Sequence, residues 1–228
     1  MNSTFPDYMF LSENNRKFLD AAIDYCEENN INIYATPESF VYTDDYETVK
    51  ASGYFYAADD ESGELAIAVG LPYWFTIFVH EFGHATQWVD TFTQEDTPYS
   101  QTDMDFDGYH IDAGALIELW LKEIIELSDE VLKDAMLRVL NMELDADCRA
   151  IQMIRAWNLD MDVEDYIKRS NAYIFFYRYM LESRTWYDPD NKPYENKNIV
   201  KNMPTTVDID HMSSKYDDIM ELFRKEKI

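Results

Sequence analysis

The sequence predicts an α+β fold, with a small antiparallel or mixed sheet near the N-terminus and a predominantly helical C-terminal half. Two observations carry this prediction. Residues 31–70 form short segments rich in β-branched and aromatic side chains, whereas apolar residues recur at helical spacing through much of 111–228. The 228 residues contain no repeat or low-complexity tract, and 46% of them are hydrophobic, enough for one core. We therefore expect a single domain spanning 1–228.

The N-terminal part is expected to be one helix followed by strands. Residues 12–29 place apolar side chains at helical spacing behind Ser12, a residue type that commonly caps helix N-termini. Four β-rich segments then follow, at 33–36, 40–42, 53–58 and 64–70. The last two are expected to form a hairpin, because the Asp- and Gly-containing residues 59–63 between them are typical of a turn.

Helices are expected to dominate the rest of the chain. Residues 72–89 are apolar nearly all round, which predicts a buried helix. The Asp-rich stretch 91–108 has the composition of a loop, and 185–210, which contains three prolines, that of an irregular segment. The remaining helices are predicted at about 111–127, 130–157, 162–184 and 213–225.

The composition excludes several classes of protein. Lys and Arg number 19 against 45 Asp and Glu, and the resulting net charge of −26 repels nucleic acid phosphates and anionic membranes. Cys26 and Cys148 are too few for a disulfide scaffold. We find neither a secretion signal nor an apolar run near the roughly 18 residues of a membrane span. We expect a cytoplasmic protein that binds no nucleic acid and no membrane, and whose acidity suits a basic protein partner.

The segment His80-Glu81-Phe82-Gly83-His84 is an HExxH motif within the predicted buried helix. Histidines four residues apart project from one face of a helix, so both rings can bind the same zinc ion. Glu81 lies beside them, in the place of a general base that activates water. We therefore expect His80 and His84 to be metal ligands and Glu81 to be catalytic.

A catalytic zinc usually takes three protein ligands, so a third is expected. Glu143 is the preferred candidate, because it lies within a predicted helix and Asp147 follows on the same face. Glu143 is then expected to bind zinc, while Asp147 accepts the outer N–H of a zinc-bound histidine. Asp90, six residues after His84, and His110, which has no partner at ligand spacing, are weaker candidates.

Together these segments resemble those of gluzincin metallopeptidases, in which HExxH is followed by a helix with a glutamate ligand and a second acidic residue four positions later. Here the two segments are HEFGH and the ELDAD of residues 143–147. The order of elements is similar to that of the ImmA and IrrE type of soluble minimal gluzincins, often encoded by phages, and the likeness covers 52–90 and 140–155. The resemblance implies a zincin-like fold and a zinc-dependent metallopeptidase with a peptide or protein substrate.

In such an enzyme a zinc-activated water is expected to attack the peptide carbonyl, with Glu81 taking the water's proton. Gluzincins also supply a donor for the developing oxyanion, commonly Tyr or His. The resemblance therefore implies that one of Tyr173, Tyr177 and His211 has this role, and the sequence leaves the choice among them open.

A second metal site and other functions are also open. Asp103, Asp105 and Asp107 alternate before Gly108 and could bind calcium, although Gly114 replaces the glutamate that an EF-hand needs. An alternative function is that of an acidic interaction protein or DNA mimic, of the kind that phages use against restriction or repressor proteins, with a structural or vestigial zinc site. A third is hydrolysis of a non-peptide amide, since HExxH does not specify the substrate.

Overall fold

The computed structural model describes residues 5, 8–43, 50–57, 62–188, 191–207, 213 and 216–228. Within these residues the chain combines seven α-helices with one three-stranded sheet and two smaller strand pairs, which confirms the predicted α+β class. The chain divides into two compact units, which we describe separately. Unit 1 comprises 1–97 and 148–161, and unit 2 comprises 98–147 and 162–228. That 1–228 forms a single domain stays a prediction.

The first α-helix of unit 1 is α1 (Glu13–Glu28), which follows the short 3₁₀ helix Tyr8–Phe10, and its start is the predicted one. The Ser12 side chain accepts a hydrogen bond from the backbone N–H of Asn15, which caps the helix. The five apolar residues at helical spacing are all buried: Phe18, Leu19, Ala22, Ile23 and Cys26. The strands that follow are β1 (Ile31–Thr36), β2 (Val41–Tyr42), β3 (Lys50–Ala51), β4 (Gly53–Ala57) and β5 (Gly63–Ala68).

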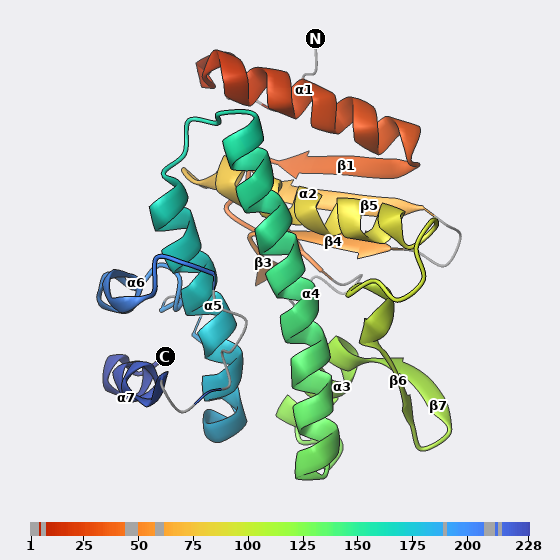
Figure 1. Ribbon diagram of the computed structural model, residues 1–228, viewed down its shortest axis with the longest axis vertical. Helices are drawn as coiled ribbons and strands as arrows, with labels where there is room; N and C mark the ends of the chain where they lie inside the picture. Colours follow the sequence, from red (N-terminus) through yellow and green to blue (C-terminus); the bar gives the residue numbers. More distant parts are fainter. Residues whose placement is uncertain are drawn as a thin grey trace. The chain divides into compact units, whose positions relative to one another are not determined.

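The main sheet has the order β1-β5-β4 and is mixed, with β1 parallel and β4 antiparallel to β5. The predicted hairpin pairing of β4 and β5 is confirmed, although residues 58–61, which include most of its expected turn, lie outside the described residues. Strand β5 is buried over Leu65–Ala68, because both of its faces are covered. Helix α2 lies along β4 and β5, and Val41 of β2 packs on Ala66 and Ala68 (Figure 1).

Helix α2 (Trp74–Asp90) carries the HExxH motif and is buried on most sides, as predicted. Phe18 of α1 makes edge-to-face contacts with Phe75, Phe78 and Phe82 along one side of α2. On the sheet side, a Cβ added to Gly53 of β4 would lie 2.7 Å from Cγ2 of Ile77, so this glycine permits the close approach of strand and helix. The motif therefore stands on a helix fixed by packing on two sides.

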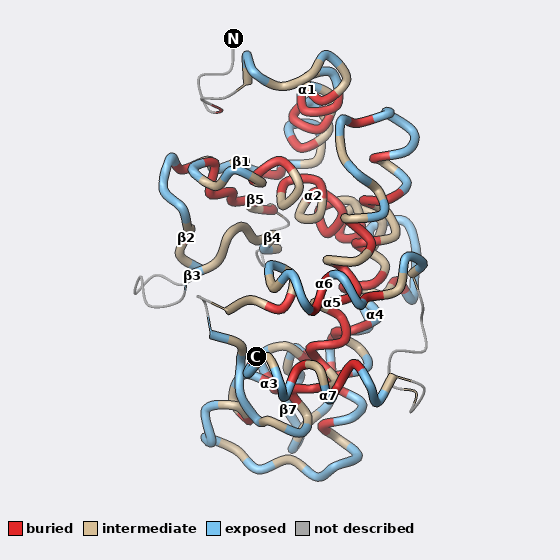
Figure 2. Tube along the Cα trace, turned by 90° about the vertical axis from the view of Figure 1, so that its left-hand side faces the viewer, coloured by how far each residue is buried: buried red, intermediate tan, exposed pale blue. Residues whose placement is uncertain are grey.

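Unit 2 is mainly helical and has its own core. The buried residues of α5 are prominent in Figure 2 and include Phe175 and Phe176, which share this core with Phe223. The elements of the unit are β6 (Asp103–Phe106), β7 (Tyr109–Asp112), α3 (Ala113–Leu121), α4 (Asp129–Ala156), α5 (Val163–Ser183), α6 (Lys197–Asn202) and α7 (Asp217–Glu226), except that residues 148–156 of α4 belong to unit 1.

Three predictions about this half need correction. The expected loop at 91–108 contains β6, which pairs with β7 through a turn at Asp107-Gly108, where both residues have positive φ. The expected helix at 111–127 is the shorter α3: the Asp112 side chain caps its start by accepting from the N–H of Ala115, and Glu123, just beyond its end, has a positive φ. The expected irregular segment contains α6, which Asn196 caps in the same way.

Across the described part of the chain, we find no helix that combines the length and the apolar character needed to cross a membrane.

Candidate metal centre

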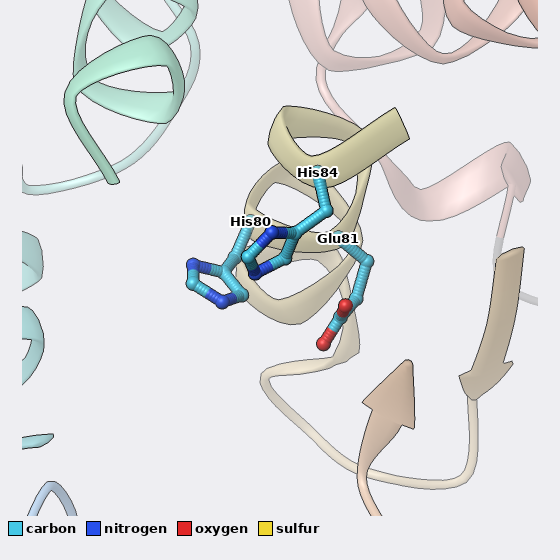
Figure 3. A group of neighbouring side chains, drawn as sticks. All are labelled: His80, Glu81 and His84. Atoms are coloured by element: carbon cyan, nitrogen blue, oxygen red, sulfur yellow. The ribbon is translucent and has the colours of Figure 1, made fainter. Parts of the chain in front are cut away.

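One turn of α2 brings three potential metal-binding side chains together. His80, Glu81 and His84 each offer a ligand atom, and these atoms lie within 4.8 Å of one another. Figure 3 shows the three side chains projecting from the same side of the helix. Among the described residues, this is the one group of three or more His, Cys, Asp or Glu side chains arranged to hold a metal ion. These three residues could therefore hold a metal ion, and the separate roles expected for them stay predictions.

The two imidazoles have a geometry that suits a tetrahedral ion. Their ring centroids are 4.8 Å apart and their planes are nearly perpendicular, at 89°. Two nitrogens that bind one tetrahedral zinc at its usual bond length lie about 3.3 Å apart. The ligand atoms of the group lie within 4.8 Å of one another, and imidazole nitrogens are donors that zinc commonly takes, so the residues present are of a kind that fits a zinc ion.

The ring of His84 is held by Gln87, one turn further along α2. Nδ1 of His84 lies 2.8 Å from Oε1 of Gln87. His84 is 7% exposed and Gln87 is fully buried. Because an amide oxygen only accepts, Nδ1 carries the ring proton in this arrangement and Nε2 carries the lone pair that a metal needs. Gln87 is not among the site residues predicted from the sequence, although its position three residues after His84, on the same side of the helix, signals this contact.

Asp90 does not join this group. Helix α2 continues through Asp90, so this residue is rotated about 120° around the helix axis from His84. Its carboxylate instead forms an ion pair of 2.7 Å with Arg149, which also donates to the hydroxyl of Thr86. The structure thus pairs Asp90 with Arg149, which argues against Asp90 as the third metal ligand.

Glu143 and Asp147 lie on the part of α4 that belongs to unit 2, and both are buried. Oδ1 of Asp147 accepts a hydrogen bond of 2.8 Å from the hydroxyl of Tyr166, and Oδ2 accepts one from Ser170. Both donors are on α5. The predicted roles, zinc ligation by Glu143 and acceptance of a histidine N–H by Asp147, stay predictions.

Two of the three candidate oxyanion donors adjoin Glu143. The hydroxyls of Tyr173 and Tyr177 are 3.1 Å apart. Burial, together with the nearby charge of Glu143, raises the pKa of both phenols well above the usual value, so both stay protonated and can donate. His211 lies outside the described residues. The structure does not select between the tyrosines.

The aspartates proposed to bind calcium belong to the β6–β7 hairpin. Asp105 stands opposite His110, and its carboxylate contacts Nδ1 of this histidine at 2.9 Å, with both side chains exposed. The described residues hold no metal-binding group that includes Asp103, Asp105 or Asp107. The hairpin thus replaces the loop on which the calcium prediction depended, and it gives His110 a partner of its own, Asp105.

Comparisons with protein-family models, with curated proteins and with solved structures each gave no match.

Proposed function

We propose that the protein is a zinc-dependent metallopeptidase with a zincin-like active site on α2. The observation that carries the proposal is the convergence of His80, Glu81 and His84 within one helical turn, their ligand atoms lying within 4.8 Å of one another. Two imidazoles one helical turn apart, with a carboxylate beside them to act as the base, are the central elements of an HExxH hydrolytic zinc site. The resemblance of HEFGH and ELDAD to gluzincin segments supports the same function.

The residues of α2 have distinct tasks in this reaction. When bound, zinc supplies a Lewis acid that lowers the pKa of water and polarises a carbonyl group. His80 and His84 hold the ion, while Glu81 takes a proton from the attacking water and returns it to the leaving amine. Glu143 remains the proposed third ligand on the grounds of its sequence position.

The first test is the zinc content of chelator-free purified protein. Wild type and Glu81→Gln are expected to hold about one zinc ion per chain, because Glu81 is not a ligand. His84→Ala is expected to lose the ion, and so is Glu143→Ala if Glu143 completes the ligand set. His110→Ala is the matched control, since it removes an exposed histidine outside the group. A wild type without zinc would overturn the proposal.

The second test is hydrolysis. A mixed peptide library is incubated with zinc-loaded protein and the products are read by mass spectrometry. Glu81→Gln is expected to retain zinc but to lose activity by about 10²- to 10⁴-fold, the usual contribution of a general base. The net charge of −26 predicts a preference for basic substrates that weakens with ionic strength. Cleavage of non-peptide amides in place of peptides would support the metallohydrolase alternative.

The net charge also favours a second candidate, an acidic interaction protein or DNA mimic with a structural zinc. In that case zinc binding is retained, no amide bond is cleaved, and binding to basic DNA-handling proteins is the same for wild type and Glu81→Gln. Loss of such binding in high salt would agree with an electrostatic interface.

A further inference from the structure

We propose that Gln87 is a positioning residue of the metal centre, whose side-chain oxygen fixes the ring of His84 as the tautomer that presents Nε2 to the ion. The proposal rests on the proposed function, because it concerns the same site. It adds a residue that the HExxH motif does not contain.

The burial of Gln87 needs an explanation. Its side chain is fully buried, and the other buried residues of α2 are mostly apolar. Burying an amide is unfavourable unless the amide is hydrogen-bonded, and an apolar side chain would fill the same volume without this cost. The contact between Oε1 and Nδ1 of His84, at 2.8 Å, satisfies the amide oxygen. A polar side chain is thus kept at a position where packing alone favours an apolar one.

The contact also selects one form of the imidazole. A neutral histidine has one N–H and one lone pair, and the amide oxygen opposite Nδ1 requires the N–H to be there. The lone pair is therefore on Nε2 before any metal arrives. In the opposite amide orientation, the NH₂ group would face Nδ1 and favour the other tautomer. A carboxylate at position 87 can only accept, so it should preserve Zn²⁺ binding if the amide oxygen faces Nδ1 and weaken it if the NH₂ group does.

Gln87 and His84 lie on the same helix, so the contact between them depends only on α2. Residues three apart lie on the same side of a helix, so Gln87 and His84 keep their relation for as long as α2 is intact. Holding the ring in advance reduces the rotational freedom that His84 loses when the metal binds. In metal sites, outer partners of this kind typically change affinity by 10- to 100-fold.

The test compares Gln87→Met and Gln87→Glu by competition of Zn²⁺ against a chelator of known affinity. Gln87→Met keeps the volume and removes the acceptor, and it is expected to weaken Zn²⁺ binding about 10- to 100-fold. Gln87→Glu offers only acceptor oxygens to Nδ1, and it is expected to bind Zn²⁺ at least as tightly as wild type. Gln94→Glu is the matched control, because it adds the same charge at an exposed position, and it is expected to leave the affinity unchanged.

Two further measurements separate positioning from a merely structural role. Absorption bands of Co²⁺ bound to Gln87→Met are expected to shift, since the ring is no longer held, while the thermal midpoint of the metal-free variant stays near that of wild type. In metal-free wild type, ¹⁵N chemical shifts are expected to show the proton of His84 on Nδ1. If Gln87→Met sharply lowers the thermal midpoint of the metal-free protein, the ¹⁵N chemical shifts of His84 in wild type still test which ring nitrogen carries the proton.

The outcomes are distinguishable. Wild-type-like Zn²⁺ affinity in Gln87→Met, an equal loss in Gln87→Glu, or a proton on Nε2 would overturn the role of Gln87 and leave the metal centre standing. A wild type that binds no Zn²⁺ would overturn the proposed function together with this inference.

Discussion

Asp147 provides a sharp test of how α4 and α5 are held together in unit 2. Asp147 is 3% exposed, and its carboxylate accepts hydrogen bonds from the hydroxyls of Tyr166 and Ser170. Both donors are themselves buried, so neither hydroxyl can turn to bulk water when the acceptor is removed. We therefore expect Asp147→Ala to destabilise the unit by more than an average surface substitution.

The magnitude follows from these contacts. A hydrogen bond to a charged group contributes about 1.5–3 kcal/mol, and Asp147→Ala removes two of them. Relief from burying the carboxylate offsets part of the loss, which leaves an expected decrease of about 3 kcal/mol in the free energy of unfolding. Asp147→Asn keeps one acceptor oxygen, so the expected decrease is about 1–2 kcal/mol. Tyr166→Phe breaks a single bond and is expected to cost about 1.5 kcal/mol.

Urea unfolding in the presence of a chelator measures these differences without a contribution from metal. A double-mutant cycle of Asp147→Ala and Tyr166→Phe is expected to give a coupling energy of about 1.5 kcal/mol. Asn141→Ala, at an exposed position of the same helix, is the control and should change the free energy by less than about 0.5 kcal/mol. A coupling energy near zero would refute the reasoning that these hydroxyls and the carboxylate act together.

Three further predictions concern unit 1. Phe18 packs edge-to-face on four aromatic rings, so Phe18→Ala should lower the free energy of unfolding by about 3–5 kcal/mol in urea, and a loss below about 1 kcal/mol would contradict this packing. A Cβ on Gly70 would overlap the carbonyl oxygen of Pro37, so Gly70→Ala should cost about 1–3 kcal/mol, seen as a lower thermal midpoint; an unchanged midpoint would speak against the contact. Burial raises the pKa of the Cys26 thiol from 9.0 to about 12, so alkylation at pH 8 should be slow until the chain is unfolded. The Cys26 thiol has a higher pKa in the folded protein than in the unfolded chain, so the stability linked to its protonated form is complete below pH 9.0 and is lost as the pH rises toward about 12. Urea unfolding of wild type and of Cys26→Ala across this pH range would show the loss.

The features predicted correctly from sequence are those with local causes. The cap at Ser12 and the spacing of apolar residues behind it define α1 within a few turns of chain. The HExxH geometry is likewise contained in one turn of α2, so His80, Glu81 and His84 meet in any structure that keeps this helix. No long-range information was needed for either feature.

The features missed from sequence have two kinds of cause. Asp107-Gly108 signals the β6–β7 hairpin, but the aspartates that alternate before Gly108 also match a calcium-binding loop, so the local sequence is ambiguous between the two structures. The parallel pairing of β1 with β5, by contrast, joins segments far apart in sequence. Neither strand contains a signal for that register, because parallel partners are chosen by how the whole sheet packs rather than by a turn.

The path of α2 after the HExxH motif excludes one source of a third metal ligand that the sequence left open. An HExxH site can take its last ligand from the same segment only if the chain turns back soon after the second histidine. Here α2 stays helical through Asp90, and the carboxylate of Asp90 is paired with Arg149. Gln87, which fills the place where a turn would need glycine, instead supports the ring of His84. In the proposed zinc site, the third protein ligand therefore has to come from an element other than α2, and zinc analysis of Glu143→Ala tests this condition.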